Sequence, residues 1–389
     1  MDILTFVAAV SLAAWLYLVF WRGGFWRADQ RLEAPPAYHG DRPGAVMPGV
    51  VIVVPARDEA PVIGRTVAAL LAQDYPGDIA LTMIDDRSSD GTADVARAAA
   101  QGDDRLHIIG GKPLPAGWVG KMWALSQGLA RATEILPEVR YFLFTDADID
   151  HDPGVLRALV AKAETERLDQ VSLMAWLRCE TAWERLLIPA FVFFFQKLYP
   201  FPWVNDPCRK LAAAAGGCVL LRRDALDRAG GIAAIKGALI DDCALARVIK
   251  PGGAIWLGLT TMTRSHRPYA ALGDIWNMVA RSAYTQLHHS PWLLAGTVVG
   301  MVVIYLAPSA ALISGVVTGH GALIALGAAA LLLIAGAYGP TLGLYNRPRI
   351  AAVLLPVAGF LYTLMTVDSA VRHWRGRGGE WKGRVQAKN

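Results

Sequence analysis

The longest uncharged stretch of the chain sets the first limit on its fold. Residues 291–345 contain no Asp, Glu, Lys or Arg. Because an α-helix needs about 20 apolar residues to cross a bilayer, this stretch leaves room for a pair of spans. Residues 3–20 form a further uncharged segment of spanning length, and residues 350–367 could form another. The sequence therefore predicts an integral membrane protein with apolar helices at both ends.

The N-terminal apolar segment is better interpreted as a retained anchor than as a cleaved signal peptide. It has no basic region in front of it and no small-residue cleavage site behind it. Arg22, Arg27 and Arg31 follow it instead, and basic residues beside a span favour the cytoplasmic side of the membrane.

Charge and cysteine usage indicate which partners and which cellular compartment the protein is expected to have. The formal net charge of +5 is concentrated beside the apolar segments, notably in the tail from Arg372 to Lys388, which indicates attraction to anionic lipid. Nucleic acid is not an expected partner, because the aromatic and basic pattern of its binding modules does not occur. The four cysteines have no C-x-x-C spacing, which agrees with a domain in the reducing cytoplasm.

Between the terminal segments lies a stretch of mixed charged and apolar residues that is long enough for one sizeable α/β domain. A linker rich in Pro, Gly and charge precedes it. The predicted organisation is an anchor with its basic flank (1–30), a linker (31–49), the α/β domain (50–287), C-terminal transmembrane helices (288–370) and a basic tail (371–389).

Strand and helix patterns alternate through the first half of this domain. Residues 50–55, 79–84 and 141–144 are apolar runs typical of buried strands. The alternation predicts a mostly parallel sheet with sites at the carboxyl ends of its strands. Acidic residues follow each of these runs, although a purely structural role does not require them.

The strongest local signal is the acidic group after the third run. Asp146 and Asp148 are spaced i, i+2, and Asp150 follows at once. Hard oxygen ligands at a strand end suit a divalent cation that keeps open positions for phosphate oxygens. The alternative is an acidic turn that caps a helix opened by Asp152 and Pro153. This stretch alone does not choose between them.

Several segments taken together resemble the nucleotide-sugar motifs of family 2 glycosyltransferases. They are residues 54–59, 84–92, 117–124, 145–148, 216–223 and 240–242. Asp58 stands where the family more usually has Asn. With the anchor and the C-terminal spans, the combination most resembles the hopanoid-associated branch near the ceramide glucosyltransferases. The resemblance covers about residues 50–287 and implies the GT-A fold, a Rossmann-like α/β fold with a mostly parallel sheet.

The resemblance also implies roles on the donor side. Glu59 and Asp86 would accept hydrogen bonds from the base and the ribose of a nucleotide-sugar, most simply a UDP-sugar. Pro55 and Arg57 belong to the same donor-binding motif. For Asp90, a turn or helix cap remains the preferred interpretation.

The phosphates and the metal are assigned in the same way. Asp148, aided by Asp146, would hold Mg²⁺ or Mn²⁺ against the diphosphate, where the ion stabilises the leaving group. Lys121 would add a positive charge beside it. His266 is a further potential metal ligand, although a structural histidine is the simpler interpretation.

Asp242 is the predicted general base. It would take the proton of an acceptor hydroxyl while the anomeric carbon is attacked from the face opposite the diphosphate, which inverts that centre. Asp241 is expected to cap the following helix. The family's Q-x-x-R-W element is altered here to residues 276–284, in which Arg281 could still bind the diphosphate. Its missing Gln and Trp argue against processive chain extension.

Residues 183–204 combine a short apolar core with many aromatic residues and with Arg185 and Lys197 at the margins. Too short to span, this segment is expected to lie in the headgroup layer of the membrane. A buried core helix is the alternative. An interfacial position would favour a lipid acceptor.

The sequence thus predicts a multi-pass protein of a bacterial-type inner membrane, with a cytoplasmic transferase domain that moves a sugar to a membrane lipid, possibly a hopanoid. A polysaccharide or polyprenyl-phosphate sugar synthase remains the nearest alternative. A non-catalytic membrane scaffold is the alternative from another class. The basic tail is predicted to be cytoplasmic, so one of the three C-terminal apolar segments should not cross the membrane.

Overall fold

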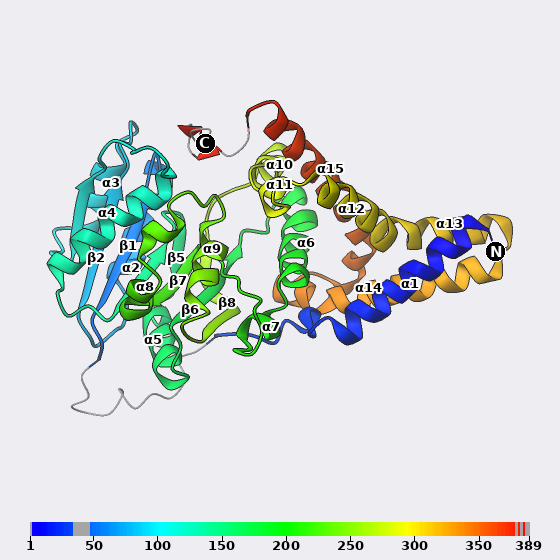
Figure 1. Ribbon diagram of the computed structural model, residues 1–389, viewed down its shortest axis with the longest axis horizontal. Helices are drawn as coiled ribbons and strands as arrows, with labels where there is room; N and C mark the ends of the chain where they lie inside the picture. Colours follow the sequence, from blue (N-terminus) through cyan, green and yellow to red (C-terminus); the bar gives the residue numbers. More distant parts are fainter. Residues whose placement is uncertain (1, 34–46, 378–379, 382–383, 386–389) are drawn as a thin grey trace. The chain divides into compact units, whose positions relative to one another are not determined.

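The computed structural model describes residues 2–33, 47–377, 380–381 and 384–385, so most of the predicted linker and part of the predicted tail lie outside it. The described chain packs into two units (Figure 1). The α/β unit comprises residues 30–178, 203–268 and 380–389, and the helical unit comprises residues 1–29, 179–202 and 269–379.

The α/β unit is built on an eight-stranded sheet with the order β3-β2-β1-β4-β7-β6-β8-β5. Strands β1 to β4 run parallel, whereas β7 is antiparallel to both of its neighbours and β5 is antiparallel to β8. The predicted mostly parallel α/β sheet is therefore confirmed. The strands are β1 (Val50–Ala56), β2 (Ile79–Asp85), β3 (Leu106–Gly110), β4 (Tyr141–Thr145), β5 (Ile149–His151), β6 (Gln170–Leu177), β7 (Cys218–Arg222) and β8 (Ile255–Ser265).

Helices cover both faces of this sheet (Figure 1). The first strand, β1, explains why, because Val50 to Val54 are all fully buried and a strand buried on both faces needs cover on both. One face packs against α2, α3 and α5, and α4 packs against β1 and β2. The helices are α2 (Ala60–Leu71), α3 (Thr92–Ala100), α4 (Gly120–Ile135), α5 (Val155–Thr165), α8 (Arg223–Arg228) and α9 (Asp241–Ile249).

Gly128 sets how closely α4 approaches the sheet. A Cβ atom at this position would lie 2.4 Å from Ile84 Cδ1 and 2.5 Å from Val53 Cγ1, well inside van der Waals contact. Because α4 begins at Gly120, this close approach also fixes the position of Lys121 at the end of the sheet.

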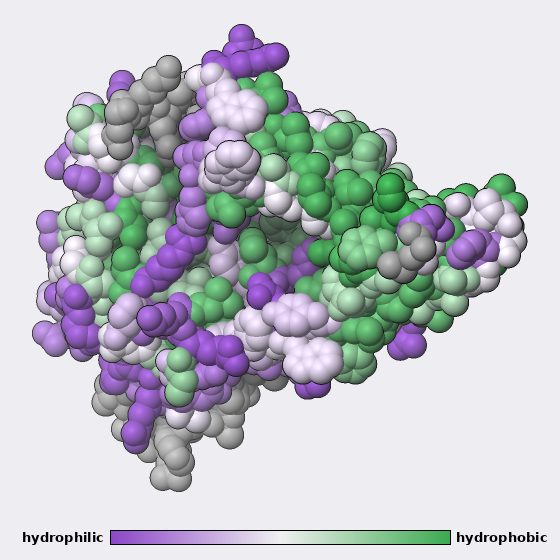
Figure 2. All heavy atoms as spheres, turned by 45° about the vertical axis from the view of Figure 1, so that its right-hand side comes forward, coloured by the Kyte–Doolittle hydropathy of each residue, from purple (hydrophilic) through white to green (hydrophobic). Residues whose placement is uncertain are grey.

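Among the described residues, the helical unit contains four helical segments long and apolar enough to cross a membrane: Ile3–Trp21, Pro291–Thr318, Gly321–Leu344 and Arg349–Trp374. Hydrophobic residues gather on the surface of this unit (Figure 2). Its elements are α1 (Ile3–Trp21), α6 (Ala182–Leu198), α10 (Leu272–Ala280), α11 (Ala283–Gln286), α12 (Pro291–Met301), the π-helical turn η4 (Val302–Leu306), α13 (Ala307–Thr318), α14 (Gly321–Leu344), η5 (Arg349–Leu354) and α15 (Leu355–Trp374).

Two groups of helices can be recognised inside this unit. Helices α1, α13 and α14 pack on one another, and a Cβ at Gly327 in α14 would lie 2.7 Å from the backbone nitrogen of Leu312 in α13. Small residues of this kind let apolar helices approach closely. The other group is formed by α15, which packs on α6, α10, α11 and α12.

The two units divide the predicted transferase domain differently from its sequence boundaries. Residues 179–202 and 269–287 lie inside the predicted 50–287 domain but pack within the helical unit. Helix α6 carries the predicted interfacial segment, and its Phe193 packs against Phe25 and Tyr338 of the same unit. One face of α6 is therefore buried against apolar helices. Its location in the headgroup layer stays a prediction.

Gly128→Ala should lower the stability of the protein. Alanine favours a helix by about 1 kcal/mol over glycine, but overpacking a filled core costs about 1–3 kcal/mol, and here two side chains block the new methyl group. We expect a lower midpoint of thermal unfolding for the full-length protein.

The matched control is Gly273→Ala, at an exposed helical glycine of α10 with no atom within 4 Å of the added Cβ. Its unfolding midpoint should stay unchanged or rise. Equal midpoints for the two variants would contradict the close packing of α4.

Candidate active site

Acidic residues from several elements meet at the carboxyl ends of β1, β2 and β4. A pocket at this edge is lined by Pro55 of β1, Asp146 after β4 and Lys121 of α4, together with Asp241 and Asp242 of α9. The structure therefore brings together residues from separate regions of the α/β unit, from Pro55 near its start to Asp242 near its end. Parallel strands whose ends share one edge produce this gathering.

Lys121 joins the acidic groups of this pocket. Its Nζ lies 2.8 Å from Asp146 Oδ1 and 3.0 Å from Asp241 Oδ2. Burial disfavours the charge of this lysine, but the two carboxylates outweigh burial and raise its pKa. Lys121 thus stays protonated and contacts both carboxylates at the carboxyl ends of the strands.

Asp242 is held by the backbone rather than by a cation. Its Oδ2 accepts a hydrogen bond from the Gly216 N–H at 2.8 Å, and its Oδ1 accepts one from the Cys243 N–H at 2.7 Å. Burial, reinforced by the neighbouring charge of Asp241, raises the pKa of Asp242 to about 6. A carboxylate with this pKa can accept a proton near neutral pH.

The predicted capping role of Asp241 is wrong. The residue before α9, Ile240, makes no side-chain capping bond, and the Asp241 carboxylate turns to Lys121 instead. A positive charge at hydrogen-bonding distance attracts a carboxylate more strongly than a neutral backbone N–H does. Asp90, by contrast, accepts hydrogen bonds from the backbone N–H groups of Ala60 and Thr92, which agrees with the preferred structural interpretation.

A second acidic group lies around Arg267, which follows β8. Its Nε donates to Asp148 Oδ2 at 2.7 Å, and its Nη2 donates to Glu59 Oε1 at 2.8 Å. Both carboxylates are largely buried. Sequence reasoning considered only His266 in this segment and missed Arg267. The available signal was the position of Arg267 as a basic residue just after a strand, but that strand, β8, had not been predicted from the sequence.

Arg57 and Asp86 form a third contact at this edge. Arg57 Nη1 donates to the backbone oxygen of Asp86 at 2.6 Å and lies 4.0 Å from Asp86 Oδ2. The Asp86 side chain is only 1% exposed. The ends of β1 and β2 are thereby tied together beside Glu59.

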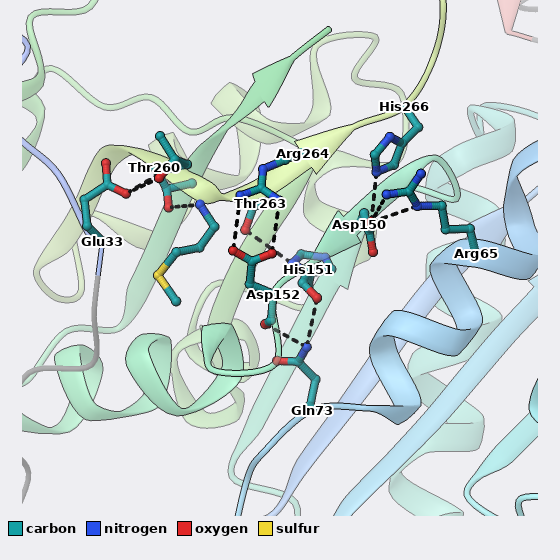
Figure 3. Close-up of polar contacts among 12 residues, drawn as sticks. Glu33, Arg65, Gln73, Asp150, His151, Asp152, Thr260, Thr263, Arg264 and His266 are labelled. Atoms are coloured by element: carbon teal, nitrogen blue, oxygen red, sulfur yellow. Dashed lines mark hydrogen bonds and ion pairs between the residues drawn. The ribbon is translucent and has the colours of Figure 1, made fainter. Parts of the chain in front are cut away.

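The ring of His266 contacts Asp150. Its Nε2 lies 2.9 Å from Asp150 Oδ2, the same oxygen to which Arg65 Nε donates at 2.9 Å (Figure 3). Asp150 therefore sits between two basic side chains.

Arg281 is the predicted donor-binding residue that belongs to the other unit. It lies at the C-terminal cap of α10 in the helical unit. Its predicted role on the diphosphate stays a prediction.

Asp146 and Asp148 fit a divalent ion only in part. Each uses one carboxylate oxygen for a cation, Oδ1 of Asp146 for Lys121 and Oδ2 of Asp148 for Arg267. Within the described ranges, no group of three His, Cys, Asp or Glu residues could hold a metal ion. An ion at this pair would need its remaining ligands from elsewhere, such as phosphate oxygens, and the predicted role of Asp146 and Asp148 in metal binding stays a prediction.

Comparison with known proteins agrees with this fold. Residues 51–230 match the sequence model of glycosyl transferase family 2. Over 129 residues the chain is 33% identical to the beta-monoglucosyldiacylglycerol synthase of Synechocystis sp., an alignment that covers 33% of this chain and 26% of that protein. The match thus spans about a quarter of that relative.

A solved structure resembles nearly the whole chain. It is a mannosyltransferase from Pyrobaculum calidifontis in complex with GDP-Man and Mn²⁺, with a TM-score of 0.57 and 19% identity over 96% of this chain and 99% of that chain. At this identity the likeness concerns the fold. Together with the family match and the sheet described above, it shows that the α/β unit has the GT-A glycosyltransferase fold.

Proposed function

We propose that the protein is a membrane-bound, inverting glycosyltransferase that moves a sugar from a nucleotide-sugar, most simply a UDP-sugar, to a membrane lipid. The surroundings of Asp242 support this assignment most directly. A half-buried carboxylate with a raised pKa lies in a pocket beside Lys121 and Asp146. This is the combination that a general base beside a diphosphate requires.

In the proposed reaction, Asp242 accepts the proton of the acceptor hydroxyl. The oxygen of that hydroxyl then forms a bond to the anomeric carbon, and the bond from this carbon to the diphosphate oxygen breaks. The two backbone N–H groups on Asp242 orient its carboxylate during the transfer. Because the attack comes from the face opposite the leaving group, the anomeric centre is inverted.

On the donor side, Glu59 and Asp86 are proposed to bind the nucleoside, with Arg57 and Pro55 beside them. Asp146 and Asp148 would hold Mg²⁺ or Mn²⁺, and such an ion, when bound, neutralises charge on the departing diphosphate. Lys121 and Arg267 already neutralise the same carboxylates. Phosphate oxygens of the donor can therefore replace these carboxylates as hydrogen-bond partners of Lys121 and Arg267.

A lipid acceptor is supported by the apolar helices that are long enough to cross a membrane. The relative from Synechocystis is, by its name, a synthase of beta-monoglucosyldiacylglycerol, which is a glycolipid. Motif resemblance narrows the proposed acceptor further to a hopanoid or a related lipid. A polyprenyl-phosphate acceptor is the second candidate, and no observation on the described residues favours it over the first.

Asp242→Asn should reduce transfer by about 100-fold or more, the usual loss on removing a positioned base. Donor binding should persist, because Asp242 contacts backbone N–H groups rather than the proposed donor side. The measurement compares lipid extracts of a strain lacking the protein after complementation with wild type or with the variant. The glycolipid missing from the deletion strain should return only with wild type.

The pH profile of wild type provides the control for the Asp242 assignment. The base works deprotonated, and its pKa is about 6, so kcat/KM should rise about tenfold per pH unit below 6 and level off above it. A profile flat from pH 5 to about 7 would contradict a base with this pKa, as would loss of donor affinity in Asp242→Asn.

Asp148→Ala should abolish metal-dependent donor binding while the protein stays folded. The carboxylate lies at a strand end, where it packs little of the core, and Arg267 would keep its contact with Glu59. Calorimetry with Mn²⁺ and UDP measures this directly. Asp152→Ala, at an exposed carboxylate paired with Arg264, is the matched control and should bind like wild type. Unchanged binding in Asp148→Ala would refute the metal assignment.

The orientation in the membrane follows from the substrate, because nucleotide-sugars are made in the cytoplasm. If α1, α13 and α14 cross the bilayer and α15 lies beside α10, α11 and α12, the turn around Thr318 faces outward and the basic tail faces inward. The segment that does not cross would then be α15, whose Asp368 accepts a hydrogen bond from Trp276 of α10. This arrangement satisfies the preference of basic residues for the cytoplasm.

Cysteine labelling tests this topology. In a variant without the exposed Cys208, a cysteine at Thr318 should react with a membrane-impermeant reagent in intact cells. A cysteine at Arg377 should react only after the membrane is opened. Labelling of Arg377→Cys in intact cells would show that α15 crosses and that the tail lies outside.

A further inference from the structure

One basic side chain of the helical unit is placed among aromatic rings. Lys197, near the C-terminal end of α6, donates from Nζ to the Tyr305 hydroxyl at 2.8 Å. Its Nζ also lies 4.6 Å from the centre of the Tyr305 ring and 5.1 Å from that of Phe194. The ammonium group is thus surrounded by apolar rings and by one neutral hydroxyl.

The position of Tyr305 is built into the helical unit. Tyr305 is fully buried and lies in the π-helical turn η4, where the ordinary hydrogen-bond ladder of a helix is interrupted. Trp15 of α1 donates from Nε1 to the backbone oxygen of Ile304 at 2.7 Å, and its ring meets Tyr305 edge to face. π-helical turns occur frequently at functional sites.

A second cation lies at the same end of α6. Arg22, which follows α1, donates from Nε to the backbone oxygen of Lys197 and from Nη2 to that of Leu198, both at 3.4 Å. The Arg22 side chain is therefore held against the backbone of Lys197 and Leu198 at the end of α6. In Figure 1 the ends of α1 and α6 also lie close together.

No carboxylate balances Lys197. Among the described residues its ammonium group contacts the Tyr305 hydroxyl and two aromatic rings but no carboxylate, and residues 291–345, which supply Tyr305, contain no Asp or Glu at all. Burial, reinforced by the charge of Arg22, lowers the pKa of Lys197 to about 7. A bound anion would reverse this effect, because an opposite charge favours the protonated amine.

We propose that Lys197 and Arg22 bind the phosphate of a lipid headgroup. Helices long and apolar enough to cross a membrane surround them, so a lipid phosphate is the anion that can reach them with its acyl chains still in the membrane. Basic groups between membrane helices recognise anionic headgroups in this way. The phosphate could belong to a bulk anionic phospholipid or to a phosphorylated polyprenol.

This site would operate whether or not the sugar acceptor proposed above is correct. Binding of any anionic phospholipid would make it a headgroup site that steadies the helical unit. Selective binding of a polyprenyl phosphate would make it the acceptor's own phosphate site. The two sources share one chemistry and differ in the lipid that is retained.

Native mass spectrometry of the full-length protein tests the site. The protein is released from detergent after incubation with phosphatidylglycerol, undecaprenyl phosphate or zwitterionic phosphatidylcholine at equal concentration. Wild type should retain at least one phosphate-charged lipid in preference to phosphatidylcholine. Lys197→Met, which keeps the length of the side chain and removes its charge, should bind that lipid roughly five- to tenfold more weakly, as expected for one cation at a headgroup.

Two further variants separate this site from general effects of charge. Lys197→Arg keeps the cation and should bind like wild type. Arg185→Gln removes an exposed charge from the same helix and should also bind like wild type. If Lys197→Met does not fold, Arg22→Gln takes its place with the same expected loss.

Retention of phosphatidylcholine equal to that of both phosphate lipids by wild type would overturn the proposal. Undiminished binding of the phosphate lipid by Lys197→Met would overturn it equally. Binding of both phosphate lipids supports the bulk-phospholipid source, and binding of undecaprenyl phosphate alone supports the acceptor source. Activity is not needed for any of these measurements, so their outcome is independent of the Asp242 test.

Discussion

The gathering of carboxylates at one edge of the sheet is the constraint on which the active site depends. Parallel strands deliver Glu59, Asp86, Asp146 and Asp148 to the same edge, and α9 adds Asp241 and Asp242. Like charges this close repel one another unless cations are placed among them. Lys121 and Arg267 meet this need, each contacting a pair of carboxylates. Asp242 accepts hydrogen bonds from backbone donors instead, and its burial beside the charge of Asp241 keeps its pKa high enough for a base.

The position of Lys121 depends in turn on the packing of α4. The helix approaches β1 and β2 at Gly128, where no side chain can be accommodated, and its first turn then carries Lys121 to the strand ends. The charge balance of the site is therefore coupled to the core of the domain. A change that moves α4 outward would weaken the contacts of Lys121 with Asp146 and Asp241 without touching either carboxylate.

Local sequence patterns predicted the parts of this arrangement that local physics determines. The buried runs of β1, β2 and β4 and the acidic residues after them follow from strand patterning and from the low preference of Asp for strands. The partner of each carboxylate did not follow. Arg267 is more than 100 residues from both Asp148 and Glu59, and Asp241 was expected to cap a helix because the pattern of a cap is local whereas its contact with Lys121 is not. Residues 179–202 were assigned to the transferase domain for the same reason, since only packing reveals the unit to which α6 belongs.

Two acidic residues of the helical unit show how its charged groups are stabilised. Glu184, fully buried at the start of α6, accepts hydrogen bonds from the backbone N–H groups of Glu180, Thr181 and Tyr269. Asp368 in α15 pairs with Arg372 at 2.8 Å and accepts a hydrogen bond from Trp276.

The buried Glu184 thus follows the rule that a charge withdrawn from water is stabilised by opposite charge or by several donors, and the half-buried Asp368 also has a cation and a donor. Lys197 has a hydroxyl and two aromatic rings, which offer an ammonium group much less than a carboxylate would. Within one and the same unit, the acids are balanced by the protein, whereas this lysine is balanced only when an anion comes from the membrane.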